Sequence, residues 1–171
     1  MSLDTLQDLL VAQLKDIYSA EKQITHALPK MIKTARNKAL AEAFSHHLVE
    51  TEGQIARLEE IFQYLGVSPR GKKCKGMEGL LAEGDETMAE KGEEPVIDAG
   101  LITDARRVEH YEIAAYNSTI ALADVLSQGN IVKLLQHSLD QEQAADAKLT
   151  EIARTEVNPH ALVAAVSPEA V

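Results

Sequence analysis

Four glutamates, one in each of four long helical patterns, stand where a helix would bury an apolar side chain or close to such a position. Glu112 is the clearest case, because alternating steps of three and four residues place it on one face with a stripe of mostly apolar residues. That stripe comprises Ile97, Leu101, Ala105, Val108, Ala115, Thr119, Leu122 and Leu126. An unpaired buried carboxylate costs several kcal/mol. Glu112 therefore requires a cation, a proton or a hydrogen-bond network.

Glu21 and Glu142 occupy equivalent positions in two other stripes, within residues 4–33 and 130–156. Glu50 lies nearer the edge of its face, about 40° from Gln54 at about 100° per residue. Each of the four glutamates falls within a few residues of the midpoint of its helix. In a four-helix bundle, midpoints share one level along the axis, so the four carboxylates are expected to meet in one layer of the core.

Neighbouring positions offer further oxygen ligands to the same layer. Gln54 follows Glu50 by four residues and Asp146 follows Glu142 by four, and this spacing keeps both members of a pair on one face. Glu109 precedes Glu112 by three residues. The predicted metal ligands are therefore Glu21, Glu50, Gln54, Glu109, Glu112, Glu142 and Asp146.

Carboxylates this close together cannot all stay ionised without cations, because like charges raise each other's pKa. Two bridged metal ions would neutralise four carboxylates, as in di-iron and di-manganese bundles. A ligand set of oxygen atoms favours Fe, Mn or Mg over Zn or Cu. Such ions would lie about 3.5–4 Å apart and leave positions open for an oxygen species.

Composition indicates what must hold this layer in place. The 171 residues suffice for one domain, and an aromatic content of 4% with no tryptophan favours helices over sheets. A net charge of −10 argues against nucleic-acid binding and suits a protein that attracts cations. The lone Cys74 excludes an internal disulfide and fits a reducing cytoplasm. The acidic N-terminal stretch resembles neither a signal peptide nor a membrane span, so a cytoplasmic location is expected.

The pattern predicts an all-α protein with one bundle over residues 1–157 and a C-terminal tail over 158–171. Long helices are expected at 4–33, 37–65, 94–126 and 130–156, with Asp4 and Gln7 as the first capping pair. The glycine-rich segment 66–94 is long enough to cross the bundle and contains a short helical pattern at 77–88.

Four sequence blocks in this order resemble the YciF-like stress-protein family of the ferritin-like superfamily: Asp16–Gln23, Glu50–Ile55, Lys75–Leu80 and Val108–Ala114. The resemblance covers about residues 3–157. It implies a ferritin-like antiparallel four-helix bundle with a long crossover, a di-metal centre, homodimers and a part in bacterial stress responses.

The chain departs from the ligand pattern that the resemblance implies, which is a lone glutamate on two helices and Glu-x-x-His on the other two. Gly53 and Ala145 stand where those histidines would be, and Gln54 and Asp146 are candidates to replace them. His47 lies on the core face one turn before Glu50. It is interpreted as a hydrogen-bonding partner or a satisfied core histidine rather than a ligand.

Other interpretations compete with each of these assignments. A single glutamate on a stripe can reflect a misjudged helix phase, and Glu109 and Gln54 could serve as hydrogen-bonding partners of the ligands. The first function hypothesis is a di-metal protein, with iron or manganese, acting on oxygen, peroxide or iron. The second is a non-catalytic structural or interaction protein with a redox-silent or vestigial metal site. A second apolar face would support a dimer, with candidates at Val11, Val49, Ile55 and Phe62.

Overall fold

The computed structural model describes residues 3–166, and every regular element in that range is a helix. The long helices are α1 (Leu6–Thr34), α2 (Lys38–Leu65), α4 (Glu94–Val125) and α5 (Gly129–Ile152). The shorter helix α3 (Lys75–Ala89) lies in the connection from α2 to α4. The predicted all-α class, with a short extra helix in the crossover, is confirmed.

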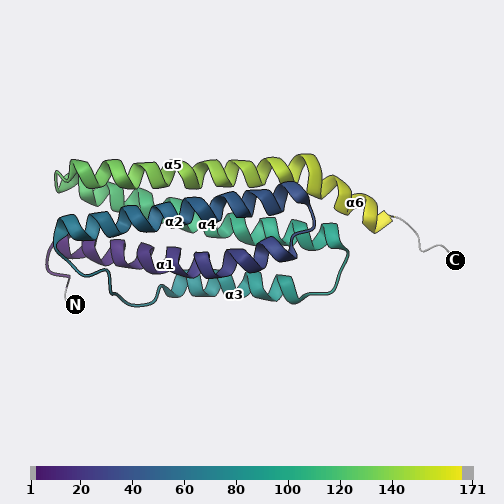
Figure 1. The fold of residues 1–171 in the computed structure, drawn as a ribbon, viewed down its shortest axis with the longest axis horizontal. Coiled ribbons are helices and arrows are strands. Elements are labelled where there is room, and N and C mark those ends of the chain that lie inside the picture. Colours follow the sequence, from purple (N-terminus) through teal and green to yellow (C-terminus); the bar gives the residue numbers. More distant parts are fainter. Residues whose placement is uncertain (1–2, 167–171) are drawn as a thin grey trace.

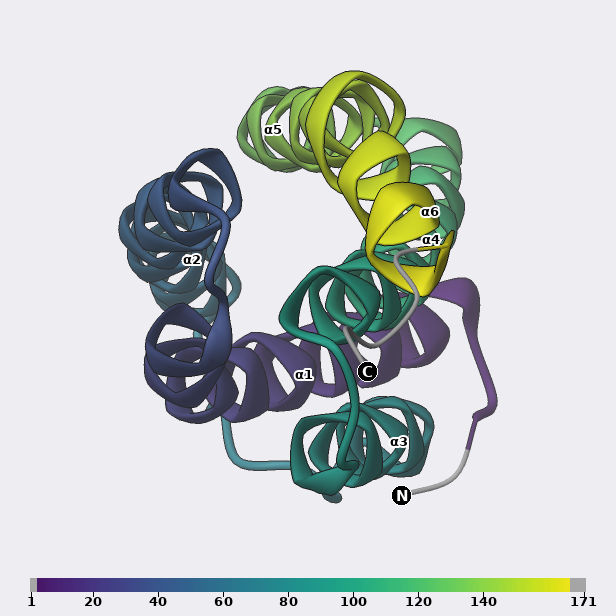
Figure 2. The same cartoon turned by 90° about the vertical axis from the view of Figure 1, so that its right-hand side faces the viewer.

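The four long helices form the predicted antiparallel bundle (Figure 1). α1 packs on α2 and α4 on α5, and the α2–α5 and α1–α4 contacts close the bundle (Figure 2). Because α2 and α4 run in the same direction, the chain must return along the whole bundle between them (Figure 1). α3 lies on this return path and packs against α1 and α4.

Side-chain caps fix where the first two helices begin. Thr5 Oγ1 accepts a hydrogen bond from the Asp8 amide at 3.1 Å, and Asp8 Oδ2 accepts one from the Thr5 amide at 3.0 Å. The predicted pair, Asp4 and Gln7, was therefore wrong by one residue, because Thr5 and Asp8 have the same spacing and form a full capping box. Asn37 caps α2 by accepting from the Leu40 amide at 2.9 Å.

Two apolar clusters fill the bundle on either side of a polar layer. One cluster contains Ile24, Leu28, Leu40, Phe44, Leu101, Ala105, Val108, Leu149 and Ile152, with others. The second contains Leu10, Leu14, Ile17, Leu58, Ile61, Tyr116, Leu135 and Leu139, with others. On α1, α2, α4 and α5 alike, the sequence between the two clusters carries buried polar residues, including Glu21, Gln54, Glu112 and Glu142. The packing thus places one buried carboxylate or amide side chain from each long helix at the same level along the bundle.

The proposed second apolar face is only partly present. Val11 and Phe62 are buried in the core, and the Phe62 ring packs edge-on against the Tyr18 ring at a centroid distance of 5.7 Å. That part of the prediction was wrong, because the core-facing stripes of α1 and α2 are wider than the residues first assigned to them. Val49 is 66% exposed, as an outer position should be. The homodimer stays a prediction.

The helix predicted to end at residue 156 changes its hydrogen-bonding pattern before that point. α5 ends at Ile152, a π-helical turn η1 covers Ala153–Val157, and α6 (Asn158–Val166) continues from it. α6 packs against α4 and η1. Residues 167–171 of the predicted tail lie outside the described residues. Among residues 3–166 there is no helix long and apolar enough to cross a membrane.

A small, partly buried hydrogen-bond network joins the start of α3 to α1 and α4. Cys74 Sγ lies 2.9 Å from Tyr111 Oη and 3.1 Å from Asp16 Oδ2, and the Tyr111 hydroxyl donates to Asp16 Oδ2 at 2.8 Å. Gly76 lies against the Tyr111 ring, where an added Cβ would come within 2.7 Å of a ring carbon. Because two hydrogen bonds hold that ring, it cannot move aside freely.

We therefore expect Gly76→Ala to lower the free energy of unfolding by about 1–3 kcal/mol, as overpacking does elsewhere. The measurement is urea unfolding followed by circular dichroism. Gly79→Ala in the same helix is the matched control, because a Cβ there meets no atom within 4 Å. Gly79→Ala should leave stability unchanged or raise it by about 0.4–1 kcal/mol. Equal effects of the two substitutions would contradict this packing.

Candidate metal centre

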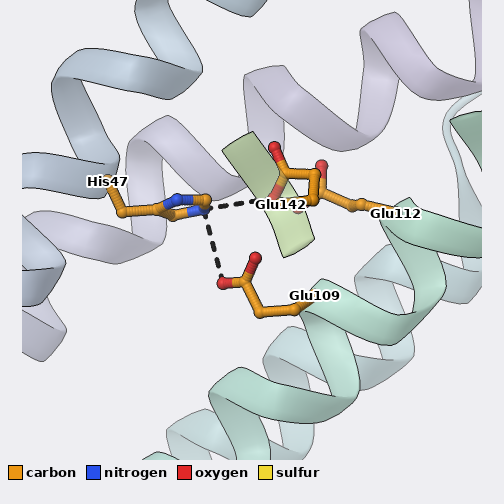
Figure 3. Close-up of side chains that lie close together, drawn as sticks. All are labelled: His47, Glu109, Glu112 and Glu142. Atoms are coloured by element: carbon orange, nitrogen blue, oxygen red, sulfur yellow. Dashed lines mark ion pairs between the residues drawn. The ribbon is translucent and has the colours of Figure 1, made fainter. Parts of the chain in front are cut away.

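The polar layer brings together a histidine and three glutamates from three helices. His47 comes from α2, Glu109 and Glu112 come from α4, and Glu142 comes from α5. All four are buried, and one potential ligand atom from each lies within 4.8 Å of the others. Figure 3 shows their polar ends converging on a common space. A group of this geometry could hold a metal ion.

The His47 imidazole faces two of these carboxylates. Its Nε2 atom lies 3.5 Å from Glu109 Oε1 and 3.8 Å from Glu142 Oε2 (Figure 3). Both distances are too long for good hydrogen bonds. A cation between the imidazole and the carboxylates would give all three groups a partner.

Glu21 and Gln54 complete the layer from α1 and α2. Both are buried, and each is held by one neighbour. The Tyr116 hydroxyl donates to Glu21 Oε1, and the Gln54 side-chain amide donates to Glu142 Oε1. Each bond leaves the second oxygen of its carboxylate free, so these contacts orient Glu21 and Glu142 without using up their ligand capacity.

The buried atoms that lack hydrogen-bond partners are concentrated in this one layer. Within the described residues, every unpartnered buried side-chain nitrogen or oxygen belongs to Glu21, His47, Gln54, Glu109, Glu112 or Glu142. Both oxygens of Glu112 and both nitrogens of His47 are among them. Buried polar atoms are normally paired, so a group of orphaned acceptors is the arrangement that a cation would satisfy.

The raised pKa values of three of these carboxyl groups also indicate a place for cations. Burial, and next the charge of Glu142, raises the pKa of both Glu21 and Glu109 well above the ordinary value of 4.5. Burial followed by repulsion from Glu21 does the same to the pKa of Glu112. Without cations, these carboxyl groups must hold protons to remain buried. Metal ions would replace those protons.

Of the seven predicted ligands, the structure brings five into the layer: Glu21, Gln54, Glu109, Glu112 and Glu142. Glu50 lies at its edge. The Glu50 side chain is 19% exposed, and its Oε2 atom lies 3.2 Å from Nδ1 of His46 and 4.0 Å from Nδ1 of His47. This agrees with its predicted offset from the centre of the face.

Asp146 is placed elsewhere. Its carboxylate accepts a hydrogen bond from Arg106 Nε at 2.7 Å and lies 3.4 Å from His110 Nε2, with 20% of the side chain exposed. Four residues after Glu142 on α5, Asp146 pairs instead with Arg106 on α4. The structure therefore does not bring Asp146 into the group of His47, Glu109, Glu112 and Glu142, and the metal content of a variant decides whether it is a ligand.

We expect Asp146→Asn to leave the bound metal per chain unchanged while lowering the free energy of unfolding by no more than about 1 kcal/mol, because the ion pair is partly exposed. Inductively coupled plasma mass spectrometry of the purified variant measures the first quantity. Loss of metal in Asp146→Asn would restore this residue to the ligand set.

His47 lies in the layer with three glutamates, which its spacing from Glu50 in the sequence did not indicate. It is 5% exposed and its ring nitrogens have no hydrogen-bond partner, so the interpretation as a satisfied core histidine is wrong. The signal was present, since His47 continues the stripe of Leu40 and Phe44 one turn before Glu50. In the expected pattern the histidine follows a glutamate by three residues, whereas His47 precedes Glu50 by three.

Comparison with known proteins identifies the family. The family described as a domain of unknown function, DUF892, matches residues 5–162. The chain belongs to this family. It is 41% identical over 162 residues to the protein YciF of Escherichia coli, a match that covers 94% of the chain and 98% of YciF. The predicted YciF-like membership is thus confirmed.

Solved structures of relatives have the same fold. The crystal structure of the E. coli stress protein YciF matches 91% of the chain and 98% of its own length with a TM-score of 0.87. YcfI from Rhodopseudomonas palustris is 46% identical and matches 87% of the chain and 95% of its own length with a TM-score of 0.85. The DUF892 chain is therefore a homologue of a stress protein, with the same helical bundle.

Proposed function

We propose that this DUF892 protein binds two metal ions, iron or manganese, in the polar layer and acts on oxygen, peroxide or iron during bacterial stress. The observation that carries the proposal is the confinement of unpartnered buried polar atoms, among the described residues, to six side chains at one level. Leaving even one such group unsatisfied costs about 1–3 kcal/mol. A cation-binding role accounts for all of them together.

The charge of the layer supports two ions. Glu21, Glu109, Glu112 and Glu142 are all buried, and their carboxylates would carry four negative charges. Two divalent ions neutralise four charges, whereas one ion would leave two to be neutralised by protons. Glu50, at the edge of the layer and near His47, offers one further oxygen ligand to a second ion.

The ligand types select among metals. Carboxylate oxygens suit hard and borderline ions, and the His47 imidazole adds a ligand that Mg²⁺ rarely uses. This mixed set of several carboxylates and one imidazole favours Fe and Mn. Bound iron or manganese would supply redox change and open coordination positions for oxygen or peroxide.

The chain's own residues would hold and insulate such a centre. Tyr116 orients Glu21 and Gln54 orients Glu142 through the bonds described above. The apolar clusters on both sides of the layer exclude water and keep the carboxylates in a medium of low polarity. Because each carboxylate comes from a rigid helix, the ligand positions are set before any ion binds.

A role in stress protection is transferred from E. coli YciF, which is described as a stress protein. A cytoplasmic location and a homodimer belong to the same proposal. The net charge of −10 suits a protein that draws cations from solution.

Turnover tests the catalytic part of the proposal. The protein is loaded with ferrous iron without oxygen, and oxidation of iron and loss of added peroxide are then followed against a Glu142→Ala control. We expect both reactions in the wild type and neither above background in the variant. Metal binding without either reaction would instead support a non-catalytic stress protein with a redox-silent site.

A further inference from the structure

A cavity of about 460 Å³ opens between α2 and α5 directly beside the metal centre. Its walls are mainly apolar and include Ala43, Phe44, Ala145 and Leu149. Small side chains on both helices leave this space. Dioxygen and peroxide contain two heavy atoms each, and a water molecule takes about 30 Å³ of liquid. The cavity is therefore far larger than those molecules need and falls within the range of small-molecule sites, about 300–1,000 Å³.

Two buried polar side chains line the same cavity. His47 is 5% exposed and Glu109 is 3% exposed, and both ring nitrogens of His47 and Oε2 of Glu109 lack hydrogen-bond partners. Figure 3 shows the two side chains pointing toward each other. An apolar cavity with buried, unsatisfied polar groups along it is suited to a molecule with an apolar body and one polar end.

The charges along the cavity indicate which polar end is suitable. Glu42, Glu50 and Glu109 line it, and among the described lining residues Lys148 is the one lysine or arginine. These carboxylates disfavour an anionic ligand. A metal ion between Nε2 of His47 and Oε1 of Glu109 would use one atom of each residue and leave His47 Nδ1 and Glu109 Oε2 without a partner. A hydroxyl group can accept from the imidazole Nδ1–H and donate to the carboxylate Oε2, which a carboxylate ligand cannot do.

We infer that the cavity between α2 and α5 binds a small, uncharged organic molecule with an apolar body and one hydroxyl group, of the phenol type, with the hydroxyl directed at His47 and Glu109. This inference rests on the proposed function, since it names an organic substrate class for the metal centre. Phe44 and Leu149 contact the apolar body, and the alanines leave room for a planar ring.

The probe is 4-fluorophenol, titrated into protein loaded with Mn²⁺ and followed by fluorine NMR. Paramagnetic Mn²⁺ speeds the relaxation of a nucleus only when the two are close, so the readout reports binding beside the centre and not turnover. 4-Fluorobenzoate serves as an anionic probe of similar shape. We expect saturable relaxation enhancement with the phenol and about tenfold weaker binding of the benzoate.

Variants that fill the cavity test the location. Ala43→Leu and Ala145→Leu should each weaken phenol binding about tenfold and together abolish it, with manganese content unchanged. Ala56→Leu is the matched control, because Ala56 is an exposed residue of α2 that does not line the cavity. Thermal unfolding of each variant checks that it is folded, and sedimentation is measured on the same samples.

The outcomes distinguish failure of this inference from failure of the proposed function. Absence of saturable phenol binding to manganese-loaded protein overturns the inference alone, and so does benzoate binding that equals phenol binding. A dimer that dissociates only in the cavity-filled variants means that a second copy covers the cavity, and this also overturns the inference. If no manganese binds, the proposed function fails by itself. In that case the fluorine line widths of 4-fluorophenol with metal-free protein show whether the phenol binds. Binding that is lost in Ala43→Leu supports the cavity as its site, and absence of binding overturns it.

Discussion

Replacing Glu112 by leucine is expected to abolish metal binding and, at the same time, to raise the free energy of unfolding of the metal-free protein by about 1–4 kcal/mol. Both oxygens of Glu112 are buried without a hydrogen-bond partner, so the metal-free protein bears the cost of desolvating them. Leucine removes that cost and joins the apolar clusters on either side. The measurements are metal content and urea unfolding in the presence of a chelator.

Two variants isolate the cause. Glu112→Gln keeps the shape but removes the charge, and it should weaken metal binding while raising metal-free stability less than leucine does. Asp124→Leu replaces an exposed carboxylate of the same helix. It should leave the metal content unchanged and change the free energy of unfolding of the metal-free protein by no more than about 0.5 kcal/mol. A Glu112→Leu protein that is less stable than wild type without metal would mean that this carboxylate is satisfied by a partner other than a cation.

The metal-free and metal-loaded proteins are expected to respond to pH in opposite directions. The pKa values of Glu21, Glu109 and Glu112 are raised in the folded protein above their ordinary value of 4.5, first by burial and then by neighbouring carboxylates. Above about pH 4.5 the unfolded chain loses these protons while the folded protein keeps them. Each rise in pH therefore favours unfolding, by at most about 1.4 kcal/mol per pH unit for each such group.

Metal ions reverse the direction in which stability changes with pH, because they bind the deprotonated carboxylates and release protons. Chelator-treated protein should lose stability from about pH 5 to pH 8, whereas the extra stability given by iron or manganese should grow over the same range. Unfolding by urea at several pH values, with and without metal, measures both slopes. Glu112→Leu should flatten the metal-free slope. A metal-free stability that rises steadily across this range would contradict the account of the layer.

Residues could be placed from the sequence wherever their position along a stripe determined their place in the core. Glu21, Glu112 and Glu142 lie on the centre lines of their stripes and are buried in the layer. Their common level followed from helix length, since long antiparallel helices of similar length align their midpoints. The crossover was predictable because its glycines interrupt the helical pattern.

Residues whose role depends on a neighbouring helix were less predictable. Asp146 has the right spacing along α5, yet Arg106 on α4 binds its carboxylate. His47 lies opposite Glu109 and Glu142, and this contact between helices is not encoded in the order of residues on α2. The cavity beside these residues depends on alanines from two helices that are distant in sequence. The periodicity of a sequence predicts which face of one helix is buried, whereas a site is formed by side chains from several helices.

The central claim is tested most directly by the metal content per chain of protein purified from its own host. Wild type, Glu21→Ala, Glu142→Ala and Asp146→Asn are measured side by side. The account predicts about two Fe or Mn ions per chain in the wild type and in Asp146→Asn, and loss of metal in the two glutamate variants. A wild-type protein without metal, together with glutamate variants that fold as well as it does, would contradict the claim.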